Sequence, residues 1–251
     1  MNFPLYLPLI MIPSRYFIIA GIFYFIFYIL FKNNFIHLKI QKLFPKSKML
    51  VSEIFFSLQT MIIFAVFSIL IRHLIINDYS MVYMSISDYG VIYFLFSTLV
   101  LILIHDFYFY FSHKLIHYKK LFFIHQRHHL STNPTPWSAF SFGPIEAVIQ
   151  IIWLPIIILI LPLHPFSLLI WVLWMMTMNV IGHLGFEIYS KNFLNGFIGK
   201  ILNASTHHNL HHSRSKSNFG LYFTFWDKIL GTEDENYRLT YETIKKSSRN
   251  T

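Results

Sequence analysis

The sequence predicts an all-α integral membrane protein with four to five membrane helices, the last two forming a hairpin, and a histidine-rich helical cap on the cytoplasmic side. Of its 251 residues, 55% are hydrophobic and only 12% are charged, against about 25% charged residues in a typical soluble domain. The basic residues stand in short blocks between apolar runs, and the fourteen histidines are concentrated between His105 and His212. Too few polar side chains are present to cover a water-facing surface, so much of the exterior is expected to face lipid.

The composition excludes several classes of function. The net charge of +9 comes from short basic blocks, which are typical of the cytoplasmic flanks of membrane helices and not of a nucleic-acid-binding face. No nucleic acid partner is therefore expected. The chain contains no cysteine, which rules out disulfides, thiolate zinc sites, a cysteine nucleophile and cysteine-ligated iron–sulfur clusters within it.

The first membrane helix is expected at Tyr16–Phe31. The apolar segment before it, Phe3–Ile12, is interrupted by prolines and has neither a cationic start nor a small-residue cleavage site, so it is not interpreted as a removable signal peptide. A lysine block follows from Lys32 to Lys48, and its apolar residues recur at helical spacing with Lys39 off that stripe. Two interpretations remain open for this block: an interfacial helix on the membrane surface, or a basic loop.

The second and third membrane helices are expected at Ile54–Ile71 and Val91–Phe111. The connection between them contains two aspartates and no lysine, whereas the lysine block precedes the second helix. By the positive-inside rule, residues 32–53 are cytoplasmic and residues 72–90 are outside. The third helix then returns the chain to the cytoplasm, where it meets a basic stretch made of Lys114, Lys119, Lys120 and Arg127.

The last apolar pair, Ile145–Leu161 and Phe166–Ile181, is joined by the tight uncharged connection from Pro162 to Pro165. It predicts a helical hairpin that enters and leaves from the cytoplasmic side. The sequence after it is polar and basic, so every histidine cluster is expected on one side of the membrane. The chain is thus divided into N-terminal membrane helices with the basic interfacial segment (residues 1–90), a histidine-rich domain (91–232) and a polar C-terminal tail (233–251).

Histidines in this domain recur at spacings of three and four, which on a helix places the imidazoles on one face. A lone pair of this kind is more often chance than a metal site. Several clusters of neutral imidazoles on one side of a membrane, however, indicate binding of a transition metal. The clusters are His113 and His117; His125, His128 and His129; His208, His211 and His212, preceded by His207; and the weaker pair His183 and Glu187.

The number of histidines indicates two metal ions. Four ligands complete a tetrahedral site and six an octahedral one, so eight to ten imidazoles exceed the capacity of one ion. Two adjacent ions with open positions in a membrane enzyme are best suited to O₂ activation on iron, and zinc in the same positions would reflect preparation or a structural role. Asp106, two helical turns before His113, is expected either to accept a ring N–H or to serve only as a polar helix end.

These motifs resemble the three histidine boxes of the fatty acid hydroxylase superfamily, which includes the sterol desaturases. The surrounding sequence is similar as well, in the stretches His105–Tyr110, Asn133–Trp137, Asn218–Gly220 and Trp226–Thr232. The resemblance covers about residues 91–232, and the Pro-Thr-Pro stretch is most similar to the sterol C5-desaturase branch.

The resemblance implies a non-haem di-iron enzyme that uses O₂ and two external electrons to hydroxylate or desaturate a C–H bond of a lipid, either a sterol or an acyl or alkyl chain. It implies eight core ligands in the three boxes, with His183 as a ninth and His207 as a tenth ligand or a neighbour without a ligand role. Glu187 is expected to orient an imidazole in preference to binding metal. The implied ligands are His113, His117, His125, His128, His129, His183, His207, His208, His211 and His212.

The electrons must come from a partner of the cytochrome b5, ferredoxin or flavoprotein type, because the chain has no flavin, nucleotide or haem motif. A bacterial plasma membrane with the active site on the cytoplasmic side is the expected location. Two other classes of function are less favoured by the sequence. A membrane zinc hydrolase would carry an HExxH motif, which the sequence lacks, and a divalent-metal transporter would place its ligands near the middle of the membrane.

Overall fold

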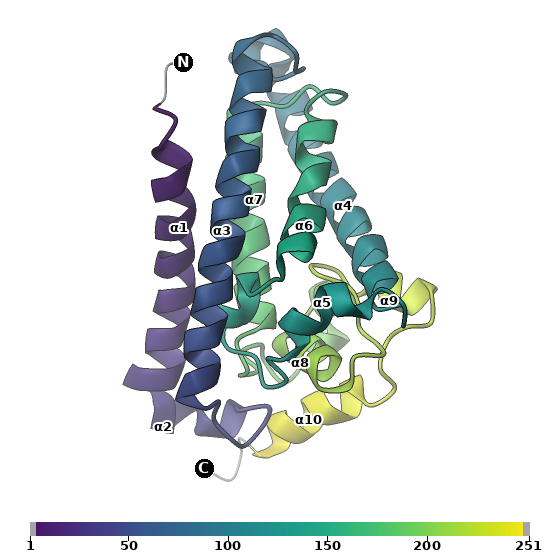
Figure 1. Cartoon of the computed structure of the whole chain (residues 1–251). Helices are drawn as coiled ribbons and strands as arrows, with labels where there is room; N and C mark the ends of the chain where they lie inside the picture. Colours follow the sequence, from purple (N-terminus) through teal and green to yellow (C-terminus); the bar gives the residue numbers. More distant parts are fainter. Residues whose placement is uncertain (1–3, 248–251) are drawn as a thin grey trace.

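The computed structural model describes residues 4–247, which form a bundle of long helices with a group of short helices at one end, at the bottom of Figure 1. Within these residues, β pairing is limited to two isolated bridges, so the predicted all-α class is confirmed. The helices are α1 (Leu7–Tyr24), α2 (Lys32–Phe35), α3 (Ser47–Ile76), α4 (Gly90–Ile116), α5 (Phe122–His129), α6 (Pro144–Ile157), α7 (Pro165–Gly182), α8 (Ser205–Arg214), α9 (Phe225–Ile229) and α10 (Tyr237–Ser247).

Four helical segments in the described chain are long and apolar enough to cross a membrane: Leu7–Leu30, in which a π-helical turn continues α1, and the helices α3, α4 and α7. The first segment begins well before the predicted Tyr16. Pro8 lies in its first turn, where the missing N–H has no helical partner to lose, and Pro13 lies inside the helix, as membrane helices tolerate. The predicted start of this helix was therefore too late.

The predicted hairpin is formed by α6 and α7, but its first arm is short. A 3₁₀ turn, Pro136–Phe140, packs against α1, α3 and α7, so the chain is already inside the bundle when α6 begins at Pro144. At 1.5 Å per residue, α6 is about 21 Å long and does not span a bilayer alone. The hairpin turn meets the α3–α4 connection, where Met81 N donates to Ile158 O over 2.8 Å.

The lysine block combines short helical turns with a loop over residues 39–46, so it forms neither one continuous helix nor a loop throughout. It contains α2 and a 3₁₀ turn, Ile36–Leu38, before α3 begins. Lys39, which the stripe pattern placed facing out, is fully buried. Its Nζ lies 3.4 Å from both Asn133 Oδ1 and Gly185 O and 5.2 Å from the centre of the Phe186 ring, and these contacts with carbonyl oxygens and aromatic faces offset part of the cost of burying the ammonium group.

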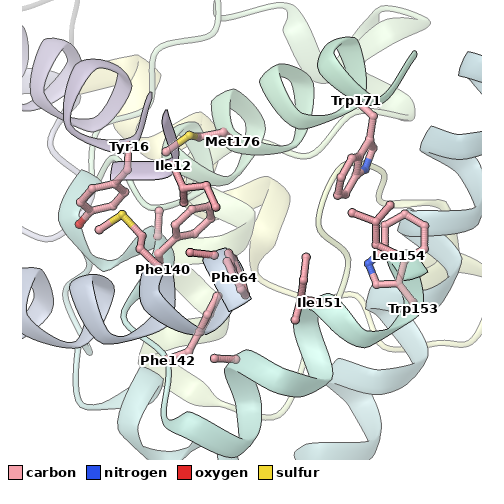
Figure 2. Packing of buried hydrophobic residues seen from close by; sticks show 14 of the residues in the cluster. Ile12, Tyr16, Phe64, Phe140, Phe142, Ile151, Trp153, Leu154, Trp171 and Met176 are labelled. Carbon is pink, nitrogen blue, oxygen red and sulfur yellow. The ribbon is translucent and has the colours of Figure 1, made fainter. Parts of the chain in front are cut away.

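The bundle core is aromatic and aliphatic, and it joins α1, α3, α6 and α7 (Figure 2). Tyr16 is fully buried and stacks on Phe140 at 5.7 Å, while its hydroxyl donates to Trp137 O over 2.6 Å. Large apolar side chains are also exposed along the outer faces, among them Val66 at 61% and Ile92 at 86% exposure. A soluble protein rarely shows continuous apolar faces of this kind, and the surface therefore matches a lipid environment.

Gly185 provides a stability test. Its φ of +74° favours glycine, and a Cβ there would lie 2.7 Å from Tyr28 Oη and 3.0 Å from Pro134 O. Gly231 has a similar φ of +63° with nothing within 4 Å of an added Cβ. We expect Gly231→Ala to cost about 1–2 kcal/mol from backbone strain alone, and Gly185→Ala to cost clearly more because the loop must also move. Thermal unfolding in detergent measures both, and equal losses would contradict the packing described for Gly185.

Candidate metal centre

The structure brings nine of the ten predicted ligand histidines into two adjacent groups at the end of the bundle where α5 and α8 lie. Within each group the ligand nitrogens all lie within 4.8 Å of one another. The five-histidine group consists of His113, His117, His125, His129 and His211, and the four-histidine group consists of His128, His183, His208 and His212.

Helical spacing explains how the boxes are shared between the groups. In α5, His125 and His129 are four residues apart and enter the five-histidine group, whereas His128 enters the other. In α8 the division is reversed: the pair His208 and His212 enters the four-histidine group, and His211 crosses to the first. Each HxxHH box therefore supplies both groups, which fixes the two groups next to each other.

The ring nitrogens that face one another are the Nε2 atoms. In the five-histidine group, Nε2 of His129 lies 3.2 Å from that of His117 and 3.1 Å from that of His211. In the four-histidine group, Nε2 of His183 lies 3.1 Å from that of His208 and 3.1 Å from that of His212. Two nitrogens bound at right angles to one ion, each at about 2.1 Å, are separated by about 3.0 Å, so the observed spacing fits a shared metal ion.

In three of these rings the opposite nitrogen, Nδ1, is held by a backbone carbonyl. Nδ1 is 2.8 Å from Phe219 O in His113, 2.7 Å from Ser217 O in His211 and 2.8 Å from Asn179 O in His183. A carbonyl oxygen only accepts, so each of these rings must carry its proton on Nδ1. The Nε2 atoms of these rings are consequently bare acceptors, as metal ligation requires.

Burial keeps these rings uncharged. Desolvation, followed by the repulsion of neighbouring imidazoles, lowers the pKa of His128, His208 and His212 well below its usual value. Desolvation lowers the pKa of His183 to about 4 and that of His117, on the edge of the site, to about 4 as well. Neutral imidazole is the form that binds metal, so the ligands are in this form at neutral pH.

Glu146 is the site residue that the sequence interpretation missed. It is fully buried at the start of α6, and its Oε1 accepts a 2.5 Å hydrogen bond from Nδ1 of His125. A carboxylate behind a ligating imidazole orients the ring and raises its basicity. A signal was present, since Glu146 is the one acid in the apolar hairpin segments, and a lone acid there is a marker of function.

The two predicted supporting acids bind backbone instead of imidazole. Asp106 Oδ1 accepts from the backbone N–H of Tyr222 over 3.0 Å, and Glu187 Oε2 accepts from the N–H and hydroxyl of Thr206 over 3.0 and 2.7 Å. Neither acid is hydrogen-bonded to a ligand imidazole in the described part of the chain, and for Asp106 this agrees with the second of its two expected roles, that of a polar helix residue. Glu187 caps the first turn of α8, where N–H groups lack helical partners, and thereby positions a ligand-bearing helix.

Asp106 and Asp227 together fix the loop that follows α8. Asp227 accepts from the N–H groups of Phe219 and Gly220, each over 2.8 Å, and Asp106 binds the same loop at Tyr222. The carbonyl of Phe219 in turn accepts from His113. The carboxylates therefore act on the metal site through the backbone carbonyls that orient the rings.

His207 lies outside both groups. It is fully buried, and its Nε2 is 3.6 Å from Oδ2 of Asp227. The position of His207 agrees with the second of its two predicted roles, that of a neighbour of the site without a ligand role. The structure thus supports nine ligand positions, with His183 among them, and gives no support to a tenth.

A cavity of about 230 Å³ lies between α1, α3, α4, α6 and α7, next to the histidine groups. Among its lining residues, Phe109 has its ring centre 5.0 Å from that of His113, and Phe142 has its ring centre 5.0 Å from that of His128. Asn179, whose carbonyl holds His183, also lines it. The cavity is largely apolar, which suits a hydrocarbon group beside the site.

Comparison with curated proteins finds several sterol-modifying enzymes. The chain is 27% identical over 158 residues to a Δ7-sterol 5(6)-desaturase of Gibberella zeae, covering 62% of this chain and 47% of that protein. It is 27% identical over 184 residues to human lathosterol oxidase, covering 72% and 60%. It is 32% identical over 146 residues to methylsterol monooxygenase 1 of Rattus norvegicus, covering 57% and 48%. The chain thus spans about half the length of these relatives.

No solved structure matches the chain. The sequence profile of the fatty acid hydroxylase family matches residues 98–232, which is more than half of the chain and contains all nine grouped histidines. The relatives confirm the predicted resemblance to the sterol desaturase branch. The protein belongs to the fatty acid hydroxylase family.

Proposed function

We propose that this protein is a membrane-bound di-iron oxidoreductase that hydroxylates or desaturates a C–H bond of a lipid, with O₂ as oxidant and two electrons from a partner. The observation that carries the proposal is the convergence of nine imidazoles, eight of them buried, in groups of five and four, with the Nδ1 protons of His113, His183 and His211 held away from the centre. Imidazole is a good ligand for iron, and two iron ions bound in the two groups would together supply two electrons for the reduction of O₂.

The reaction balances with two electrons and two protons. For hydroxylation, one oxygen atom of O₂ enters the C–H bond and the other leaves as water; for desaturation, two hydrogens leave the lipid and both oxygen atoms become water. Bound iron supplies the oxidising chemistry. The names of the relatives suggest a sterol as one candidate substrate, and an acyl chain is the other.

The chain's own residues supply position and a dry environment. The carbonyls of Phe219, Ser217 and Asn179 fix three ring orientations, so the ligands do not have to reorganise during turnover. Phe109 and Phe142 line the cavity next to the ligand rings and exclude water from the carbon to be oxidised. Glu146 holds the proton of His125 at Nδ1 and keeps that imidazole in its ligating form.

The rival functions are less well supported by the same geometry. A zinc hydrolase needs a carboxylate that reaches the metal-bound water, but the groups found among residues 4–247 contain only histidine. A transporter is expected to hold its ion at the middle of the membrane, but the groups lie at one end of the bundle (Figure 1).

We further propose that this end faces the cytoplasm, on the positive-inside argument, and that an acidic electron carrier docks there. Lys119 and Lys120 are exposed beside α5. Arg127 is a weaker part of such a surface, because it donates to Ser52 Oγ and lies 3.7 Å from the centre of the Phe56 ring. The relatives compared come from fungi and mammals, so they do not support a bacterial plasma membrane.

Substitution of Glu146 tests the role of the buried acid. Loss of the carboxylate in Glu146→Ala should lower iron affinity about 10–100-fold, because the ring of His125 loses the partner that orients it. Glu146→Gln keeps an acceptor and should lose less. Competition with a chelator measures the affinities, and Glu235→Gln, at an exposed acid, is the control. An unchanged affinity in Glu146→Ala would remove this residue from the site.

Turnover tests the proposed reaction. Iron-loaded protein in detergent, given O₂ and a reduced ferredoxin, should convert a Δ7-sterol or a fatty acyl lipid to a product with one added oxygen or one added double bond. His128→Ala and His211→Ala, one from each group, should lower the rate at least about a hundredfold. His73→Ala, outside both groups, should not. Iron uptake with no oxidation of any lipid, or equal rates in all variants, would contradict the proposal.

A further inference from the structure

The cavity beside the histidines contains one charged residue. Arg15, on α1, lines it together with apolar side chains and a few neutral polar ones, and no aspartate or glutamate is among the lining residues. Figure 2 shows the apolar side chains of α1, α3, α6 and α7 that surround this part of the bundle. Neither the metal site nor the packing of the helices explains why a cation, Arg15, lines this largely apolar cavity.

Arg15 lies inside a membrane-spanning segment. It is eight residues after Leu7, the first residue of the segment Leu7–Leu30, which at 1.5 Å per residue places it about 12 Å along the helix. An arginine at such depth is costly unless it is paired, and an unexplained ionisable residue in a span is a marker of function. Its cost must therefore be offset by an interaction.

The described protein residues do not supply that interaction. The Nε of Arg15 is buried and has no acceptor among residues 4–247. The acid of the neighbouring helix α3, Glu53, is fully buried and accepts a hydrogen bond from Thr135 Oγ1 over 2.6 Å, and neither residue lines the cavity. An Arg15 side chain that extended to the membrane surface would carry its Nε out of the cavity lining, where that atom is buried, so such extension does not account for its position.

A second cavity shows where a long molecule would continue. It measures about 640 Å³ and shares Pro8, Met11 and Ser68 with the first. Arg15 lines only the first cavity, beside the histidines, while Arg72 lines only the second. The second cavity is lined by both a cation, Arg72, and an acid, Asp78, whereas Arg15 is the one charged residue among the described residues that line the cavity next to the metal site.

We propose that Arg15 selects lipids with a negatively charged head group, whose carboxylate or phosphate oxygens pair with its guanidinium inside the cavity. The planar fork of arginine matches both oxyanions, and the low dielectric of the site strengthens the pair. Gln150, which also lines the cavity, offers a neutral donor in the same cavity. This inference rests on the proposed function, because it names the class of lipid that the site oxidises.

Binding without turnover tests the inference. Radiolabelled palmitate, hexadecyl phosphate, hexadecanol and cholesterol are each titrated onto the protein in nanodiscs of neutral lipid, at a pH where palmitate is ionised. The wild type should bind at least one of the two anions about tenfold more tightly than hexadecanol and cholesterol, and Arg15→Met should abolish that preference. Arg15→Lys, which keeps the charge but loses the planar fork, should retain part of it. Arg238→Met, at an exposed arginine that lines neither cavity, is the matched control and should leave it unchanged.

The outcomes separate this inference from the proposed function. The anion that shows the preference identifies the source as a fatty acid or a lipid phosphate, and either one supports the role of Arg15. Equal affinities for the anions and the neutral lipids, or equal losses in Arg15→Met and Arg238→Met, would overturn it. Iron content is measured on the same samples: a protein that fails the binding test while holding two irons refutes only the inference, whereas failure to hold iron refutes the proposed function.

Discussion

The structure depends on one electrostatic constraint: nine imidazoles, eight of them buried, must remain neutral while their bare Nε2 atoms face one another at about 3 Å. Lone pairs at distances such as the 3.1 Å between His129 and His211 repel one another unless a cation lies between them. The protein holds four of the rings in place from behind, because their Nδ1 protons bind backbone carbonyls or Glu146. Assembly of the site and binding of its metal are thus expected to be coupled.

The buried acids of the domain hold the ligand histidines in position, and they do so at increasing distances from the metal site. Glu146 contacts a ligand ring directly, while Asp106 and Asp227 hold the loop whose Phe219 carbonyl contacts His113. Glu187 holds the first turn of α8, where it binds Thr206. These roles explain why a chain with few acids places so many of them in its interior. They also explain how these residues affect the metal site without being ligands.

Helical periodicity made the ligands predictable from sequence, because residues three and four apart share a face. Their division was not predictable, since whether His128 joins His125 or His183 depends on how α5, α7 and α8 pack. Tertiary contacts also determine the burial of Lys39. The stripe pattern predicted an exposed side chain, but the loop at Gly185 covers it. The four long apolar segments were found from hydropathy, but the early start of α1 was missed because Pro8 was interpreted as a break and not as a first-turn residue.

The central claim is that the histidines form two unequal metal sites, and Mössbauer spectroscopy of protein loaded with the active iron isotope tests it most directly. Because one group offers five imidazoles and the other four, the account predicts two distinct iron signals of equal area. Loss of His183, which belongs only to the four-histidine group, should alter one signal and leave the other in place. A single signal, unequal areas, or equal changes in both would contradict the division into two sites.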